Sequence, residues 1–173
     1  MSTSPAAFLD FHPRLTQVIL TELESFGATP DMISRIKQVI DYNVVGGKMN
    51  RGLSVVDTVK IMRGETELPK DVNEKAMVLG WAVEWLQSFF LVADDIMDES
   101  PTRRGQPSWY RCKGVGMLAI NDSFILESCI YRLLKKYFRS ETYYVDLVEL
   151  LHETSYQTQL GQMVDLLTAP END

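Results

Sequence analysis

The sequence is poor in the residues that build disulfide frameworks and zinc sites. Its 173 residues include two cysteines, Cys112 and Cys129, and neither belongs to a zinc-binding spacing. We expect both thiols to stay reduced, as is typical of a cytoplasmic protein. The N-terminus, MSTSPAAFLDFHPR, has no basic segment followed by an apolar run, so we expect no signal peptide.

The chain also lacks an excess of positive charge. Its formal net charge is −7 at pH 7, which argues against a general nucleic-acid-binding protein and against adhesion to anionic membranes. A local basic cluster can still bind a small anion such as a phosphate, because the net charge describes only the chain as a whole.

No apolar run has both the length and the uniform composition of a membrane span. The nearest candidate is residues 76–93, AMVLGWAVEWLQSFFLVA, which has roughly the minimum length for one. Glu84, Gln87 and Ser88 interrupt it, and a charged side chain at mid-bilayer costs about 2.5–3.5 kcal/mol on insertion scales. We therefore expect this segment to be a buried core helix and not a membrane span.

No segment alternates polar and apolar residues in the manner of a β-strand. Apolar residues instead recur at spacings of three and four, which predicts an all-α fold. We expect helices at residues 6–26, 32–45 and 53–64 in the first part of the chain. Pro13 is expected to bend or divide the first of them, and Asp31 to cap the second.

The longest predicted helix runs from about Asn73 to Asp98. It leads into residues 99–117, which are dense in proline, glycine and charge, and which we interpret as a functional loop. Two further helices are expected at about 119–138 and 142–167. The chain shows no repeat and no low-complexity segment, so the sequence predicts one domain.

Three aspartates end the apolar run of the long helix. Asp94 and Asp98 are four residues apart and share one face, with Asp95 about 100° around the helix. Carboxylates with this spacing suit Mg²⁺, which prefers one or two protein carboxylates together with phosphate oxygens and water. A bound cation would also offset the unfavourable interaction of these charges with the helix dipole. The alternative is a solvated acidic helix end.

Arg103 and Arg104 follow the aspartates directly. Guanidinium groups beside carboxylates that bind Mg²⁺ suggest a diphosphate held by metal ions on one side and by arginines on the other. The alternative is a salt bridge between one of these arginines and Asp98 or Glu99.

A second basic cluster lies in GGKMNRG, residues 46–52. Lys48 and Arg51 come after two glycines and just before a predicted helix, where backbone N–H groups favour anions. The segment does not match the Walker pattern. It therefore indicates an anion site of another kind.

Two aromatic residues, Phe89 and Phe90, precede Asp94 by about one helical turn. An aromatic side chain at this place can form the floor of an apolar tunnel that begins at the metal site. The alternative is that both phenylalanines are ordinary core residues.

Together these motifs resemble those of the farnesyl diphosphate synthases, within the trans-isoprenyl diphosphate synthase family. LQSFFLVADDIMDESPTRRGQPSWY is similar to their first aspartate-rich region, GGKMNRG to their isopentenyl diphosphate-binding segment, and ETSYQTQLGQMVDLLTAP to their next diagnostic stretch. The similarity runs from about Phe8 to Pro170. The DDxxD motif also occurs in terpene cyclases, but its combination with GGK-x-x-R and paired arginines indicates prenyl-chain elongation.

The resemblance implies a role for each matching residue around the allylic diphosphate. Asp94 and Asp98, supported by Asp95, would coordinate Mg²⁺ that bridges this diphosphate, and Arg103 would grip it. Gln162 and Asp165 would face the allylic site from a neighbouring helix. Isopentenyl diphosphate would be bound by Lys48, Arg51, Gln87 and Arg104. Phe89 and Phe90 would stop growth of the product at fifteen carbons.

The chain departs from the family by lacking a second aspartate-rich motif. One reading is that residues 1–173 are the N-terminal part of a single all-α prenyltransferase domain, which condenses isopentenyl diphosphate with dimethylallyl and geranyl diphosphate. On that reading this chain alone would be inactive or nearly so. The other reading is a non-catalytic truncated paralogue or subunit that binds diphosphates or pairs with a full-length synthase. The resemblance also implies a cytoplasmic homodimer.

Overall fold

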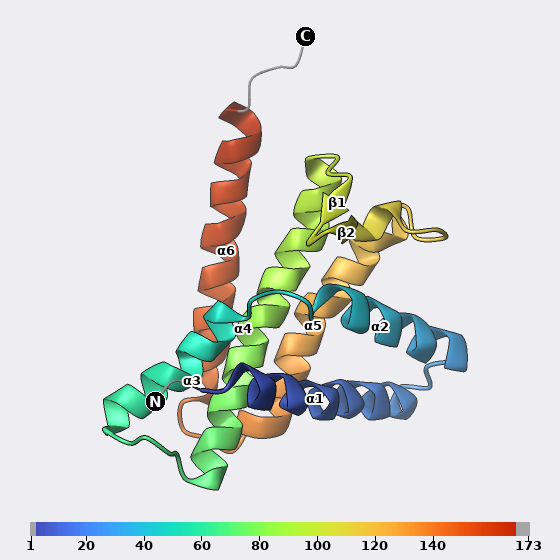
Figure 1. Ribbon diagram of the computed structural model, residues 1–173. Helices are drawn as coiled ribbons and strands as arrows, with labels where there is room; N and C mark the ends of the chain where they lie inside the picture. Colours follow the sequence, from blue (N-terminus) through green and yellow to red (C-terminus); the bar gives the residue numbers. More distant parts are fainter. Residues whose placement is uncertain (1–2, 169–173) are drawn as a thin grey trace.

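The computed structural model describes residues 3–168 and is almost entirely helical, which confirms the predicted all-α fold (Figure 1). A two-stranded antiparallel hairpin and a short 3-10 helix lie between the fourth and fifth helices. The elements in chain order are α1 (Pro5–Ser25), α2 (Pro30–Asn43), α3 (Asn50–Arg63), α4 (Lys70–Met97), β1 (Thr102–Arg103), β2 (Gln106–Pro107), η1 (Trp109–Arg111), α5 (Leu118–Phe138) and α6 (Tyr144–Thr168).

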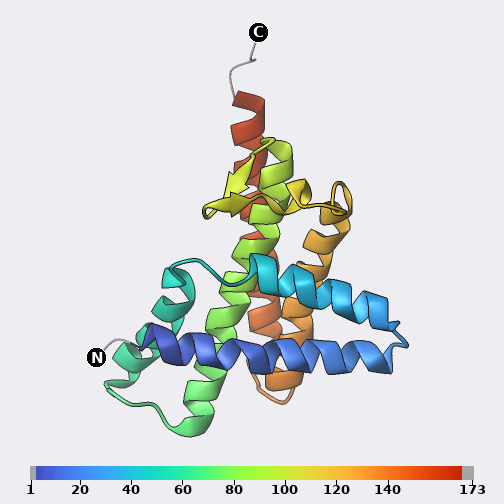
Figure 2. The same cartoon turned by 45° about the vertical axis from the view of Figure 1, so that its right-hand side comes forward.

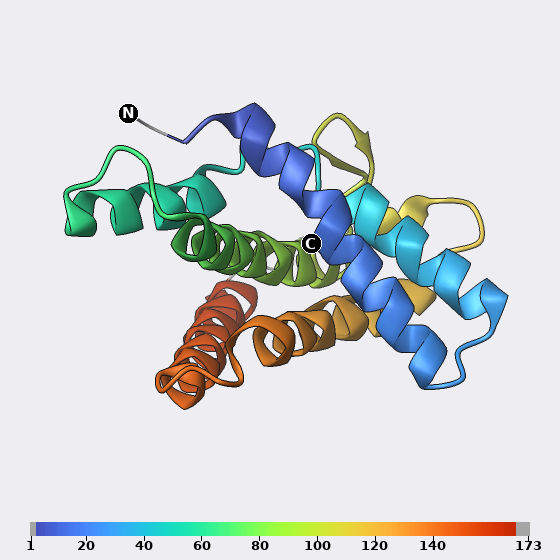
Figure 3. The ribbon, with the colours of Figure 1, turned by 90° about the horizontal axis from the view of Figure 1, so that it is seen from below.

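The helices pack in layers around α4. Seen from below, α1 and α2 cross one face of α4 and α5, and α6 lies on the other side (Figure 3). The turned view shows α1 and α2 stacked one above the other across the upright helices, with α3 beside α4 (Figure 2). This arrangement brings the C-terminal end of α4, the loop before α3 and the hairpin to the same part of the molecule.

Two details of the N-terminal helices differ from the sequence-based expectation. α1 is continuous through Pro13, which lies on its exposed side, so the alternative that Pro13 divides the helix was wrong. Asp31 does not cap α2, because the helix begins at Pro30 and the Thr29 hydroxyl accepts a hydrogen bond from the Met32 N–H at 3.3 Å. Asp31 instead lies in the first turn, where its charge suits the helix dipole.

The hairpin is a further departure, because no strand was predicted. β1 and β2 pair over two residues each, with Arg103 opposite Gln106. Arg104 and Gly105 between them both have positive φ angles, 55° and 79°, which is the backbone signature of a type I′ turn. Strands this short contain too few residues to show an alternating pattern.

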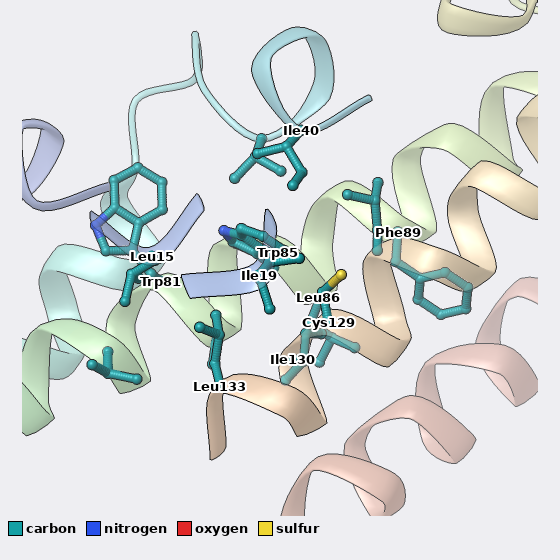
Figure 4. Close-up of a cluster of buried hydrophobic side chains, with 14 of the residues drawn as sticks. Leu15, Ile19, Ile40, Trp81, Trp85, Leu86, Phe89, Cys129, Ile130 and Leu133 are labelled. Carbon is teal, nitrogen blue, oxygen red and sulfur yellow. The ribbon is translucent and has the colours of Figure 1, made fainter. Parts of the chain in front are cut away.

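The core is centred on two tryptophans of α4. Trp81 and Trp85 are fully buried, and Leu15 and Ile19 of α1 and Leu133 of α5 complete the cluster around them (Figure 4). Burying side chains of this size contributes about 1.5–3 kcal/mol each. The cluster therefore fixes α1 and α5 against the helix that carries the aspartates.

Within residues 3–168, α4 alone has the length and composition that a membrane span requires. Its most apolar stretch is 67% buried inside the molecule. The core helix of a soluble protein has the same length, composition and burial. The burial of α4 agrees with the core helix that its interrupting polar residues predicted.

Candidate active site

The aspartates gather at the C-terminal end of α4. The Asp98 N–H donates to the Asp94 carbonyl at 2.8 Å, so the helical geometry continues through Asp98 and the two side chains lie on one face, as predicted. Asp95 points inward and is only 3% exposed, whereas Asp98 is exposed. The three carboxylates therefore divide into one inward-facing group and two that face the surface.

Arg103 folds back from the hairpin onto this cluster. Its Nε and Nη2 atoms donate to Asp95 Oδ1 at 3.0 and 2.6 Å, and Nη2 also donates to Asp94 Oδ2 at 3.2 Å. These bonds, first of all those to Asp95, raise the pKa of the Arg103 guanidinium. A salt bridge does form, but the expected partners, Asp98 and Glu99, were wrong, because the tight turn after β1 directs Arg103 to the last turn of α4.

Helix α6 also contributes side chains to the acidic cluster. Gln162 Nε2 donates to Asp94 Oδ1 at 2.9 Å, which brings Gln162 of α6 to the aspartates of α4. Although Asp98 as a whole is exposed, partial desolvation of its carboxyl raises its pKa, and the nearby charges of Asp94 and Asp165 raise it further. Four carboxylates thus converge on a region where Arg103 is the neighbouring cation.

The donor set at this cluster fits Mg²⁺ held jointly with a diphosphate. Within residues 3–168, no group of three or more histidine, cysteine or acidic side chains has the geometry of a self-sufficient metal centre. Mg²⁺ does not need such a cage, because one or two carboxylates with phosphate oxygens and water complete its coordination. Asp94 and Asp98 are the two carboxylates of α4 that face the surface and so suit that role, whereas Asp95 is buried and accepts two hydrogen bonds from Arg103.

Arg104 points the other way, onto the loop before α3. Its Nη1 donates to the carbonyl oxygens of Asn43 at 3.1 Å and Val45 at 2.9 Å. The guanidinium lies against Gly47, where an added Cβ would be 3.1 Å from Arg104 Cζ. The glycine at this position therefore makes room for the arginine.

The start of α3 is fixed by a buried carboxylate of α4. Glu84 is 3% exposed, and its Oε1 accepts a hydrogen bond from the Gly52 N–H at 2.7 Å, in the first turn of α3. Met49, at the N-cap position, provides no side-chain cap, so Glu84 satisfies a backbone donor that would otherwise have no partner. Close approach of the helices makes this possible, because a Cβ on Gly80 would lie 2.6 Å from the Gly52 carbonyl oxygen.

The sequence analysis missed this role of Glu84. A carboxylate inside an otherwise apolar helix was the available signal, because a buried charge needs a partner. In the sequence, Glu84 argued only against a membrane span. Its partner is a backbone amide of another helix, which sequence spacing does not reveal.

The structure brings the predicted isopentenyl diphosphate residues to one region. Arg51 Nη1 donates to Gln87 Oε1 at 3.1 Å across the α3–α4 interface, and Lys48 is exposed on the adjoining loop that Arg104 contacts. Of the ion pairs within residues 3–168, none involves Lys48, Arg51 or Arg104. Burial lowers the pKa of Arg104; the charge of Glu84 opposes this effect, and the charge of Arg103 adds to it. An anion bound here would be favoured by these three cations, which form no ion pair within residues 3–168.

The two phenylalanines occupy different environments. Phe89 is 6% exposed and belongs to the buried cluster (Figure 4). Phe90 is half-buried, and the centroids of the two rings are 4.6 Å apart. The packing of Phe89 agrees with the alternative of an ordinary core residue. A chain-length role for Phe89 and Phe90 stays a prediction.

A buried polar node holds the loop that carries both arginines. Asp122 of α5 is 4% exposed and accepts hydrogen bonds from Trp109 Nε1 at 2.8 Å and from Arg35 Nη2 at 2.5 Å. The Tyr42 hydroxyl donates to the Pro107 carbonyl at 2.8 Å. These residues were not predicted to matter for the site, because they join α2, η1 and α5 only through tertiary contacts.

The family profile described as polyprenyl synthetase matches residues 33–173. The chain belongs to this family. Among curated relatives, the farnesyl pyrophosphate synthase of Ganoderma lucidum is 54% identical over 95% of this chain and 46% of its own length. That of Saccharomyces cerevisiae is 50% identical over 95% of this chain and 47% of its own length.

Solved structures of polyprenyl synthetase relatives give the same result. The Trypanosoma brucei farnesyl diphosphate synthase complexed with a bisphosphonate superposes with a TM-score of 0.88 and 33% identity, over 97% of this chain and 49% of that chain. The chain thus spans about half the length of the relatives that it matches.

Proposed function

We propose that the protein to which this chain belongs is a Mg²⁺-dependent farnesyl diphosphate synthase, with residues 1–173 as the N-terminal part of its single catalytic domain. It would condense isopentenyl diphosphate with dimethylallyl and then geranyl diphosphate. The main observation behind this proposal is that the side chains of Arg103 and Arg104 point in opposite directions. Arg103 contacts an acidic cluster suited to a metal-bound diphosphate, and Arg104 belongs to a basic cluster suited to a second diphosphate. The names of the relatives support the same choice.

At the acidic cluster, Asp94 and Asp98 would hold Mg²⁺, which neutralises charge on the allylic diphosphate and so stabilises it as a leaving group. Arg103 would add hydrogen bonds to the same diphosphate, and Gln162 would keep Asp94 in position. Asp165 would contribute negative charge from α6. Asp95, bound to Arg103, orients that guanidinium.

At the basic cluster, isopentenyl diphosphate would bind to Lys48, Arg51 and Arg104, with Gln87 orienting Arg51. The allylic carbon–oxygen bond breaks, the double bond of isopentenyl diphosphate attacks the resulting cation, and loss of a proton leaves the product double bond. Apolar side chains that continue along α4 from the aspartates would exclude water that could quench the cation. Phe89 and Phe90 would limit the product to fifteen carbons.

The same proposal extends to the setting in which the enzyme works. We place it in the cytoplasm, in keeping with the free thiols of Cys112 and Cys129. We expect it to act as a homodimer. Size-exclusion chromatography with light scattering on the complete protein tests the second point, and a monomeric mass would refute it.

The activity is tested by product analysis on a complete protein that carries this chain. Labelled isopentenyl diphosphate and dimethylallyl diphosphate with Mg²⁺ should give a fifteen-carbon diphosphate as the main product. Absence of any condensation product would overturn the proposal, and would favour the alternative of a non-catalytic diphosphate-binding paralogue.

A further inference from the structure

A basic groove lies between α1 and α5, at the other end of the molecule from the aspartates. It has a volume of about 780 Å³ and opens to solvent. In Figure 1 the C-terminal end of α4 is in the upper half, whereas α1 and the C-terminal end of α5 are in the lower half. The charged residues that line the groove are Arg14, Glu22, Arg132, Lys135, Lys136 and Arg139. Five cations therefore face one carboxylate, in a chain whose net charge is −7.

Three of these cations form no ion pair with a carboxylate of the described residues. Arg132 is bound to Glu22, with Nε 2.9 Å from Glu22 Oε2. Lys135, Lys136 and Arg139 take part in none of the ion pairs within residues 3–168. The hydrogen bond from Arg132 lowers the pKa of Glu22, and the charges of Lys135 and Lys136 add to this effect. The groove is thus a region of positive potential.

An apolar pocket adjoins the groove at the Glu22–Arg132 pair. Its volume is about 290 Å³, and both members of the pair line it as well as the groove. Its apolar lining includes Phe26, which is 70% exposed, and Met32, which is 52% exposed. The Arg132 guanidinium lies 5.1 Å from the centre of the Phe26 ring. Exposed apolar side chains that surround a concave surface are typical of a binding site.

From this juxtaposition we infer a binding site for an anionic amphiphile, a molecule with an apolar chain that ends in a phosphate or diphosphate group. The head group would bind to Lys135, Lys136 and Arg139, because ammonium and guanidinium groups form strong hydrogen bonds with phosphate oxygens. The apolar chain would pass the Glu22–Arg132 pair and cover the ring of Phe26.

Stabilisation of the α5 dipole explains part of the basic cluster, since Lys135 and Lys136 lie in its last turn. It does not explain why an apolar pocket with an exposed aromatic ring adjoins the cluster. The proposed site contains one carboxylate, already bound to Arg132, so it requires no Mg²⁺. It is therefore independent of the proposed synthase activity.

The test is calorimetric titration of the purified chain with n-decyl phosphate, below its micelle concentration and with a chelator present. Inorganic phosphate and n-decanol serve as the head-group and chain controls. Decyl phosphate should bind at least about tenfold more tightly than either control, and both K135E/R139E and Phe26→Asp should weaken it by about tenfold or more. These positions are exposed, and thermal melts followed by circular dichroism check that the variants fold.

One matched charge reversal completes the design. Lys70→Glu changes an exposed lysine that lines neither cavity, and it should not alter binding. Unchanged affinity in K135E/R139E, or an equal loss in Lys70→Glu, would overturn the inference. The inference would also be overturned if the chain failed to bind decyl phosphate but sedimented with anionic phosphatidylglycerol vesicles. That result would favour binding to a membrane surface.

Discussion

Arg103 and Arg104 are adjacent in the sequence, yet they bind opposite walls of the site. Arg103 donates to Asp95 and Asp94 at the end of α4, whereas Arg104 donates to backbone carbonyls of the loop before α3. The positive φ angle of Arg104 is the local cause, because the chain reverses direction between the two side chains. One turn thereby connects the acidic cluster with the basic cluster.

Removing Arg103 should destabilise the fold more than removing Arg104. Arg103→Ala leaves Asp95, whose side chain is 4% exposed, without its charged partner. We expect a loss of roughly 2–3 kcal/mol, below the range for fully buried pairs because Arg103 itself is partly exposed. Arg104→Ala should cost about 1 kcal/mol, since it gives up hydrogen bonds to backbone carbonyls. Urea unfolding measures the loss of stability in both variants. Equal losses, or a larger loss in Arg104→Ala, would contradict the anchoring role of Asp95.

Helix contact through Gly80 should not tolerate a methyl group. A Cβ there would lie 2.6 Å from the Gly52 carbonyl oxygen, so Gly80→Ala must push α3 and α4 apart at a cost of about 1–3 kcal/mol or more. Gly161→Ala in α6 is the matched control, because a Cβ at Gly161 meets no atom within 4 Å. In a helix interior it should be neutral or stabilising by up to about 1 kcal/mol. Thermal unfolding should therefore show a lower midpoint for Gly80→Ala and an unchanged or higher midpoint for Gly161→Ala.

His12 should make the protein sensitive to mild acid. Burial between aromatic rings lowers its pKa to about 4, against a smaller opposing effect of Asp41. The unfolded chain therefore binds the proton more readily between pH 6.5 and 4, and the free energy of unfolding should fall across that window by about 3 kcal/mol.

The comparison for this effect is His12→Phe, which keeps an aromatic ring but cannot take up a proton. Urea unfolding at pH 7 and pH 4 should show a smaller loss of stability in the variant than in the wild type. Parallel pH profiles would exclude His12 as the source.

This chain alone should make no farnesyl diphosphate at a useful rate. The resemblance to the synthases implies a second aspartate-rich motif and further cationic residues that residues 1–173 do not contain. Loss of one oxyanion-stabilising donor costs about 10²–10³ in rate in other enzymes, and here several groups are missing together. The labelled-substrate assay on the 173-residue chain checks this against a complete protein. Comparable turnover in the two would refute the expectation.

The sequence predicts best what helical periodicity controls. Asp94 and Asp98 share a face because four residues make about one turn. The helix predicted to end at Gly64 does end there, and Gly64 has a positive φ angle of 64°. The partner of Arg103 was predicted wrongly, because a tight turn decides it. Glu84 bound to Gly52, and Asp122 bound to Arg35, lie 32 and 87 residues from their partners, and no local pattern encodes pairing over such separations.

The most direct test of the account asks whether the end of α4 binds an allylic diphosphate through Mg²⁺. Calorimetry with dimethylallyl diphosphate, on the K135E/R139E background so that the α1–α5 groove does not contribute, compares solutions with and without Mg²⁺. We predict that Mg²⁺ strengthens binding by about tenfold or more and that Asp98→Asn abolishes this gain. The control Asp10→Asn, at an exposed position of α1, should preserve the gain. Equal affinity with and without Mg²⁺, or an undiminished gain in Asp98→Asn, would contradict the assignment of the acidic cluster.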